Sequence, residues 1–147
     1  MQSVSFTPIG FIYTPFTKDN PPPRQGSLVK VHGTVKILDK YLDGLAYLDK
    51  FSHIILIFYL HLSFNYSLIE YPSQEFIGRG LFATRSPRRP NPIGLTICKL
   101  LKRNKNCLTI VGIDVFNKTP LLDIKPYIRK IDSFPMANNG WLKPNEF

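Results

Sequence analysis

A short basic segment, residues 80–96 (GLFATRSPRRPNPIGLT), holds the side chains best suited to binding an anion. It combines three arginines with three prolines: Arg85, Arg88, Arg89, Pro87, Pro90 and Pro92. Each guanidinium is a planar fork of donors that fits phosphate or carboxylate. Each proline fixes its own φ and biases the preceding residue to an extended conformation. We therefore expect a stiff, non-helical arch that presents cations to a ligand; a solvated loop or a PxxP-type ligand are the alternatives.

Three other side chains could accept a proton: Asp114, Asp123 and His61. The two aspartates flank a turn, and they either face each other across a hairpin or only cap that turn. His61 follows His53 along an apolar run, where a boundary residue of a strand is the simpler interpretation. At roughly 3.3 Å per residue, the two histidines are about 26 Å apart along a strand and cannot share a metal ion. The sequence therefore predicts no metal site.

The chain carries an excess of positive charge, with 19 Lys and Arg against 10 Asp and Glu, a net charge of +9 and a pI near 9.7. This imbalance favours a polyanionic partner, with nucleic acid first and an acidic membrane surface second. Lys102 and Arg103, in a predicted basic turn over 102–106, are candidate phosphate contacts together with Arg88, Arg89 and Lys125. A solvated turn is the simpler account of the first two.

Alternating apolar residues predict the elements that must position these groups. We expect strands over residues 5–14, 28–37, 51–62, 93–101, 107–116 and 119–127, and a short irregular helix over 39–50. The chain lacks a GxGxxG loop and alternating strand and helix units, which disfavours a doubly wound nucleotide-binding fold. The pattern predicts an all-β, mostly antiparallel fold: a compact single-sheet β-barrel with one or two short helices.

The length of 147 residues suits one domain. We expect the barrel to occupy residues 1–135 and a tail to follow over 136–147, with Trp141 docking on the domain or on a partner. Cys98 and Cys107 form no CxxC unit, so reduced thiols in a cytoplasmic protein are expected. The N-terminal sequence lacks the pattern of a secretory signal, and the longest apolar run, residues 54–60, is too short to span a bilayer.

Four segments, in order along the chain, resemble the TsaA-like, or TrmO, family of tRNA methyltransferases. They are PIGFIYTPF with PRQ, GLAYLDKFSHI with FYLH, the arch GLFATRSPRRPNPIGLT, and TPLLDIKPY. The resemblance implies a β-barrel unlike the usual methyltransferase fold, a homodimer, and S-adenosylmethionine as methyl donor. It also implies methylation of the exocyclic amine of threonylcarbamoyladenosine next to the anticodon of tRNA.

The resemblance also implies which residues contact the donor. By position in the family's motifs these are Pro23, Arg24, Gln25, His61, Leu62, Arg85, Leu95, Phe116, Asn117, Lys118 and Thr119. The chain departs from the family at Asn117 and Lys118, where Asp and Gly are common. A glycine permits the positive φ that lysine adopts only at a cost. Either the turn differs in shape here, or the affinity for the donor is altered.

Two other functions remain open at this point. The departure at Asn117 and Lys118 is compatible with a non-catalytic RNA-binding barrel, which has lost the methyl-transfer activity. A methyltransferase of the same fold that acts on another substrate is the third hypothesis.

Overall fold

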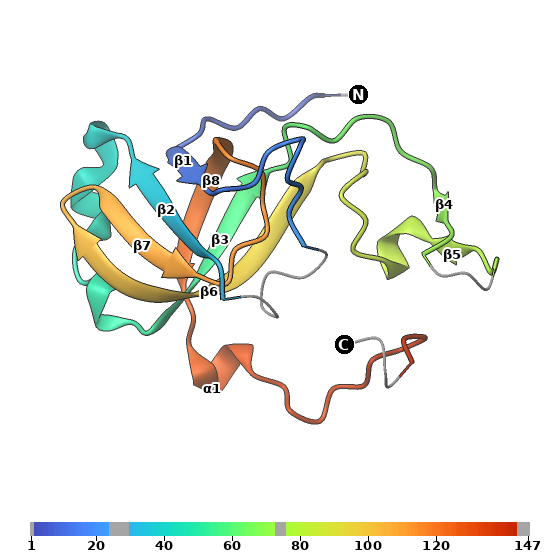
Figure 1. Cartoon of the computed structure of the whole chain (residues 1–147). Coiled ribbons are helices and arrows are strands. Elements are labelled where there is room, and N and C mark those ends of the chain that lie inside the picture. The colour runs from blue at the N-terminus through green and yellow to red at the C-terminus, as the bar shows by residue number, and fades with distance from the viewer. Residues whose placement is uncertain (1, 24–29, 73–75, 144–147) are drawn as a thin grey trace.

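The computed structural model describes residues 2–23, 30–72 and 76–143, and its main body is a closed antiparallel barrel (Figure 1). The strands follow one another around the barrel in the order β1-β2-β7-β6-β3-β8. They are β1 (Gly10–Tyr13), β2 (His32–Ile37), β3 (His53–Tyr59), β6 (Ile93–Asn104), β7 (Cys107–Val111) and β8 (Thr119–Pro126). The prediction of an all-β, mostly antiparallel barrel is confirmed.

The core of the barrel follows from the alternation of apolar residues, because successive side chains of a strand point to opposite faces. In β3, Ile54, Leu56 and Phe58 are buried, and in β2 the buried positions include Val35 and Ile37. Burying one such side chain contributes about 1.5–3 kcal/mol. Gly94 leaves space for the ring of Phe58, with which a Cβ at this position would collide.

The helical elements are short. The helix expected over 39–50 is instead two 3-10 turns, η2 (Asp39–Leu45) and η3 (Leu48–Lys50). Tyr47, at a positive φ of 63°, separates them, and Leu45 is their one buried residue. A further 3-10 turn, η4 (Leu81–Ala83), starts the arch, so the expectation of a non-helical arch holds only after these residues. The α-helix α1 (Arg129–Asp132) follows β8.

Strand register places three long connections at one end of the barrel, which we call the loop end. Tyr59 pairs with Ile93, Tyr13 with Thr34, and His32 with Val111, so β1, β3 and β7 finish where β2, β6 and β8 begin. The connections there span residues 14–31, 60–92 and 112–118. The opposite end carries η2, η3 and the β6–β7 turn. All of the donor segments implied by the family resemblance therefore belong to the loop end or to the start of β6.

Several expectations about strands and turns were wrong, among them the strands expected over 51–62 and 107–116, which cover only His53–Tyr59 and Cys107–Val111. The first strand covers only Gly10–Tyr13, because Pro8 has no N–H to donate to a ladder. The basic turn is confined to Lys105 and Asn106: Lys102 and Arg103 lie within β6. Within this turn, Lys105 has a positive φ of 53°.

The arch and the C-terminal segment lie beside the barrel (Figure 1). Before the arch, β4 (Ile69–Glu70) pairs with β5 (Arg79–Gly80) in a separate two-stranded sheet. The C-terminal segment runs back from α1 toward this sheet. There the Trp141 indole N–H donates to the carbonyl of Ala83 at 2.8 Å, and the Arg79 guanidinium lies 5.0 Å from the Trp141 ring centroid. Trp141 thus docks on the domain, one of the two possibilities that the sequence left open.

Among the residues that the structure describes, no helix has the length and apolar character needed to cross a membrane. The same residues contain no group of three or more His, Cys, Asp or Glu side chains arranged to hold a metal ion.

Candidate functional site

Hydrogen bonds stabilise the connections of the loop end and join two of them to each other. The Asn117 amide donates to the carbonyl of Phe16 at 2.8 Å, and the Leu60 amide donates to the carbonyl of Pro92 at 2.7 Å. The Thr14 hydroxyl donates to the carbonyl of Val115 at 2.7 Å. The bonds of Asn117 and Thr14 join the end of β1 to the β7–β8 connection, whereas the bond of Leu60 joins the end of β3 to the arch. The two groups are linked by the contact of His61 with Thr119 at the start of β8.

His61 lies in the turn that follows β3, and not in the strand as predicted. Its Nδ1 is 3.5 Å from Thr119 Oγ1, and the Thr119 hydroxyl donates to the carbonyl of Phe116 at 2.7 Å. The Thr119 hydroxyl proton is used in that bond, so the Thr119 oxygen can only accept a hydrogen bond from His61. Nδ1 of His61 must then carry the proton, and Nε2 of the neutral ring is an acceptor. Burial lowers the pKa of His61 because it disfavours the charged imidazolium. A neutral imidazole is thus held at the loop end.

The β7–β8 connection adopts the shape that a glycine would favour, although it has none at that position. Lys118 has φ 63°, in the left-handed region. The Asn117 side-chain oxygen accepts the Thr14 amide at 3.2 Å, as an aspartate oxygen could. Asn117 thus supplies the acceptor that stabilises the turn. The left-handed backbone conformation of Lys118 lowers stability, because it costs an L-residue roughly 1–2 kcal/mol.

The two aspartates do not face each other across a hairpin, because β7 and β8 are not neighbours in the barrel. Asp114 follows β7 and its Oδ1 accepts the hydroxyl of Thr96, in β6, at 3.2 Å. Asp123 lies in β8, where Lys125 Nζ is 2.9 Å from its Oδ2. The two carboxylates therefore lie in separate surroundings, and the prediction that they face each other is wrong.

The three arginines of the arch have different surroundings. Arg89 is half-buried, and its Nη1 donates to the carbonyls of Thr84 at 3.0 Å and Ser86 at 3.2 Å. Its guanidinium also lies 5.8 Å from the ring centroid of Phe82. Arg85 and Arg88 are exposed, and their side chains make no recorded interaction with the described residues. Arg89 thus holds the arch together, whereas Arg85 and Arg88 face solvent.

The remaining donor candidates divide between the loop end and the outer wall. Pro23 and Leu62 are half-buried in loop-end connections. Arg24 and Gln25 belong to the same connection as Pro23 but lie outside the described residues. Leu95 points outward from β6 opposite Ile57, with 58% of its surface exposed. The structure therefore gathers Leu62, Phe116 and Thr119 with His61, and places Leu95 on the neighbouring outer face.

The remaining candidates for phosphate contact lie away from the loop end. Arg103 donates to the carbonyls of Leu45 at 2.8 Å and Lys105 at 2.9 Å, so its guanidinium stabilises the opposite end of the barrel. Lys125 is paired with Asp123 on the β8 wall. Lys102 is exposed and has no recorded partner among the described residues.

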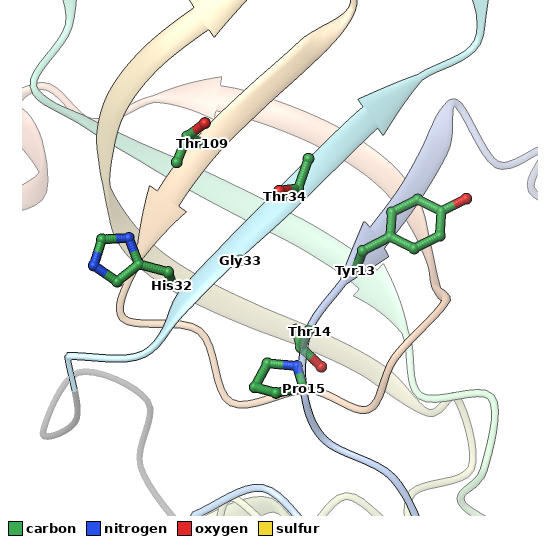
Figure 2. A pocket seen from close by; sticks show the side chains of 7 residues that line it. All are labelled: Tyr13, Thr14, Pro15, His32, Gly33, Thr34 and Thr109. Carbon is green, nitrogen blue, oxygen red and sulfur yellow. The ribbon is translucent and has the colours of Figure 1, made fainter.

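A shallow hollow of about 280 Å³ lies on the outer wall of the barrel next to the loop end. Figure 2 shows its lining on β1, β2 and β7, where Thr34 and Thr109 stand on adjacent strands between His32 and Tyr13. Thr14 and Pro15 close it on the loop-end side. Sequence reasoning did not identify this hollow.

Thr14 is the loop-end residue that sequence reasoning missed. It is bonded to both Val115 and Asn117, about 100 residues away along the chain. A threonine just before Pro15 at the end of a strand was the one available signal. The cysteines, by contrast, are both free as expected, and burial raises the pKa of the Cys98 thiol to about 12.

Comparisons with known proteins agree with this arrangement. The family model for the tRNA-methyltransferase O N-terminal domain matches residues 11–133. A probable S-adenosyl-L-methionine-binding protein of Pyrococcus abyssi (strain GE5 / Orsay) is 40% identical over 143 residues, which cover 97% of this chain and 78% of that protein. The tRNA (adenine(37)-N6)-methyltransferase of Homo sapiens is 36% identical over 134 residues, covering 86% of this chain and 30% of that protein.

Among solved structures, that of TrmO from Pseudomonas aeruginosa has a TM-score of 0.80 at 33% identity, and the match covers 97% of this chain and 64% of that chain. This chain thus spans less than two thirds of that protein. The relatives' names agree with the expectation of a methyltransferase that takes S-adenosylmethionine. Because the family match runs from Phe11 through the last strand and includes every loop-end connection, the chain belongs to the tRNA-methyltransferase O family.

Proposed function

We propose that this protein is an S-adenosylmethionine-dependent tRNA methyltransferase that acts in the cytoplasm. The proposed acceptor is the exocyclic amine of threonylcarbamoyladenosine next to the anticodon. The observation that carries the proposal is the contact between His61 and Thr119, which brings together two family-matched segments, with burial lowering the pKa of His61. The human relative, named for methylation of an adenine N6 in tRNA, supports the same class of acceptor.

The residues at the loop end fit a sulfonium donor with a carboxylate tail. His61 is neutral, Leu62 and Phe116 are half-buried apolar groups, and the carbonyl of Phe116 lies beside them. None of these groups repels a cation. Arg85 has no recorded internal partner and is available to the carboxylate. We assign Pro23, Arg24 and Gln25 to the same donor on the strength of the family resemblance.

The donor supplies an electrophilic methyl group, and the chain must orient the amine and remove its proton. An exocyclic adenine amine is a weak nucleophile because its lone pair is delocalised, so a positioned proton acceptor helps the transfer. We assign that role to Nε2 of His61, since Thr119 orients the ring through Nδ1. Asp114 is the second candidate, and its bond to Thr96 holds it at the same end.

The test combines donor binding with transfer. We expect calorimetry to detect S-adenosylmethionine binding, and we expect methyl incorporation into tRNA that bears the threonylcarbamoyl group but not into tRNA that lacks it. Equal incorporation into both would assign the enzyme another acceptor. Absence of both binding and incorporation would refute the proposal.

Arg85→Ala tests the assignment of the donor's carboxylate. We expect the variant to fold normally, because the side chain is exposed, and to bind S-adenosylmethionine about tenfold or more weakly. Arg88→Ala, three residues along the same arch, is the matched control and should leave donor affinity unchanged. Equal donor affinity in wild type and in folded Arg85→Ala would remove Arg85 from the donor site.

One observation favours the alternative of an RNA-binding barrel without turnover: the strained Lys118 in a turn that usually carries Asp and Gly. The double variant Asn117→Asp with Lys118→Gly restores the family's common pair. If the wild type is inactive and this variant gains methyl transfer, the wild-type protein is a non-catalytic binder. Activity in the wild type under single-turnover conditions would exclude that alternative.

We also propose that the active unit is a homodimer, as the family resemblance implies. On the outer face of β3 and β6, Ile55 stands opposite Ile97, Ile57 opposite Leu95, and Tyr59 opposite Ile93. We call these six residues the apolar wall. Four of them, Tyr59, Ile93, Leu95 and Ile97, expose 40–58% of their surface. An uncharged face of this kind can pack against its own copy without like-charge repulsion, and patches of this kind mark interfaces.

A further inference from the structure

The outer faces of β2, β7 and β6 together form a second wall of different chemistry. Strand register aligns its side chains in rows: His32, Val111 and Lys99; Thr34, Thr109 and Lys102; Lys36, Cys107 and Asn104. Side chains directly opposite each other on neighbouring strands lie within about 5.5 Å at Cβ. We call the outward set of His32, Thr34, Lys36, Lys99, Lys102 and Thr109 the cationic wall.

A β-bulge completes this wall. Up to Leu100, the odd-numbered residues of β6 point outward, and continued alternation would turn Lys102 inward. The register with β7 shifts between Leu100 and Lys102, so that Lys102 stands opposite Thr109 on the outer face. A bulge is a known device for re-aiming a side chain. The result is that Lys102 joins Lys36 and Lys99 on one surface.

The charge of this wall is of one sign. No aspartate or glutamate occurs within β2, β6 or β7, whose bounds are all described. Lys36, Lys99 and Lys102 are exposed and have no recorded ion pair with the described residues. On the opposite wall, by contrast, Lys125 is neutralised by Asp123. Three uncompensated ammonium groups on rigid strands favour a polyanionic ligand.

Hydroxyl groups lie among these lysines at the hollow described above. Thr34 and Thr109 face outward in the same row as Lys102, between the rows of Lys99 and Lys36, and Tyr13 lies beside them (Figure 2). Hydroxyls that donate to phosphate and sugar oxygens are typical of contacts with a nucleic-acid backbone. The hollow is also closed by Thr14, which is bonded to the Asn117 turn. The wall is thus continuous with the candidate donor site.

We propose that the cationic wall binds the sugar–phosphate backbone of RNA and leads it toward the loop end. This inference rests on the proposed function for the identity of the RNA as tRNA, but the wall's own chemistry requires only a polyanionic backbone. An anionic membrane is the less suitable ligand, because interfacial binding also needs a broad apolar face. Leu101 at the bulge is 44% exposed, and the apolar residues that precede Lys99 on the same face of β6 belong to the apolar wall, which the proposed homodimer covers.

The test uses the whole chain and the triple variant Lys36→Ala, Lys99→Ala, Lys102→Ala. Since each lysine that meets a phosphate releases counterions, the slope of log affinity against log salt should fall in magnitude by about two to three. The probe is an unmodified tRNA transcript, which separates binding from methylation. The triple variant with arginine at the same positions should restore the slope, because the charge is retained.

Two further variants sharpen the test. Thr34→Val with Thr109→Val keeps side-chain shape and removes both hydroxyls, so RNA affinity should fall several-fold while the salt slope stays unchanged. Lys130→Ala, on exposed α1, removes one charge away from the wall and should change the slope by less than the single variant Lys99→Ala.

The outcomes separate this inference from the proposed function. If the triple variant binds S-adenosylmethionine and transfers methyl groups normally but shows the wild-type salt slope, the role of the cationic wall in RNA binding is refuted and the enzyme assignment stays intact. If the lysine substitutions reduce the salt slope of RNA binding but the wild-type protein transfers no methyl group, the role of the cationic wall is supported and the enzyme assignment is refuted. If the triple alanine variant loses binding to phosphatidylserine vesicles but not to RNA, the wall is a membrane surface and the inference is wrong.

Discussion

At the scale of single residues, the chemistry that we propose for the loop end depends mainly on His61 and Lys118. His61 owes its neutral state to burial, and its orientation to Thr119, which follows from β8 beginning beside the end of β3. Lys118 holds the turn beside it in a conformation that disfavours lysine. Each residue gives a prediction that a substitution can check.

The methylation rate should depend on pH through His61. Because burial lowers its pKa below 6.5, the rate should rise with pH, and the midpoint of this rise should lie below about pH 6.5. His61→Gln should lower the rate by about 10²–10⁴-fold and remove this pH step. Asp114→Asn is the matched comparison. A pH step that persists in His61→Gln and disappears in Asp114→Asn would transfer the role of proton acceptor to Asp114.

The same pKa affects folding stability with a defined sign. The unfolded chain takes up the proton of His61 at a higher pH than the folded chain, so the unfolded state binds more protons below about pH 6.5. The contribution of the neutral imidazole is complete above that pH and is lost as pH falls toward the folded-state pKa. Wild type should therefore lose more stability than His61→Gln on acidification, as chemical denaturation at several pH values would show.

Lys118→Gly should stabilise the protein. The left-handed conformation costs an L-residue roughly 1–2 kcal/mol, and glycine loses about 0.5–1 kcal/mol of entropy on folding, so the net gain is up to about 1.5 kcal/mol. Lys118→Ala is the control, because alanine keeps the strain and should change stability by less than about 0.5 kcal/mol. Urea denaturation measures both. Equal stabilisation by alanine and glycine would show that the lysine charge, not φ, is responsible.

At the scale of elements, the arch is stabilised from within and from the C-terminal segment. Arg89 donates to two carbonyls of the arch, and Ser86 donates to Glu70 Oε1 of β4 at 3.3 Å. Trp141 contacts the arch at Ala83 and β5 at Arg79. The prolines alone therefore do not explain its shape.

Arg89→Ala should loosen the arch without unfolding the barrel. Loss of its two carbonyl contacts should raise amide exchange at Thr84, Ser86 and Arg88 by about tenfold or more, while amides of the barrel strands keep their protection. Arg88→Ala is the matched neighbour: it should leave exchange unchanged and reduce the salt slope of RNA binding by about one. Similar effects of the two variants on exchange would contradict the division of roles between them.

At the scale of the whole molecule, the barrel separates its functions on different faces. The loop end carries the candidate donor site, the faces of β2, β7 and β6 carry the cationic wall, and the faces of β3 and β6 carry the apolar wall. The long strand β6 contributes to both walls, because its outward charged residues begin at Lys99, directly after Ile97 on the same face. RNA and a second subunit can therefore bind without competing for one surface.

If the proposed homodimer forms through the apolar wall, Ile97→Arg should convert it to a monomer. The residue is 41% exposed, so the fold tolerates the change, but a buried unpaired charge at the interface would be costly. Sedimentation velocity measures the effect as a loss of the dimer peak. Ile131→Arg in α1, 61% exposed and outside the apolar wall, is the control and should leave the dimer unchanged. A persistent dimer in Ile97→Arg would place the interface elsewhere.

The sequence by itself determined the barrel class, the inward faces of β2 and β3, and the family, because alternation and short ordered motifs are local properties of the chain. Only the tertiary structure decided that Asp114 and Asp123 stand apart, that Arg89 and Arg103 bind backbone carbonyls, and that a bulge turns Lys102 outward. Those outcomes depend on which strands are neighbours and in what register. Register is set by contacts between residues far apart in sequence, as Thr14 and Asn117 illustrate, and no local pattern encodes it.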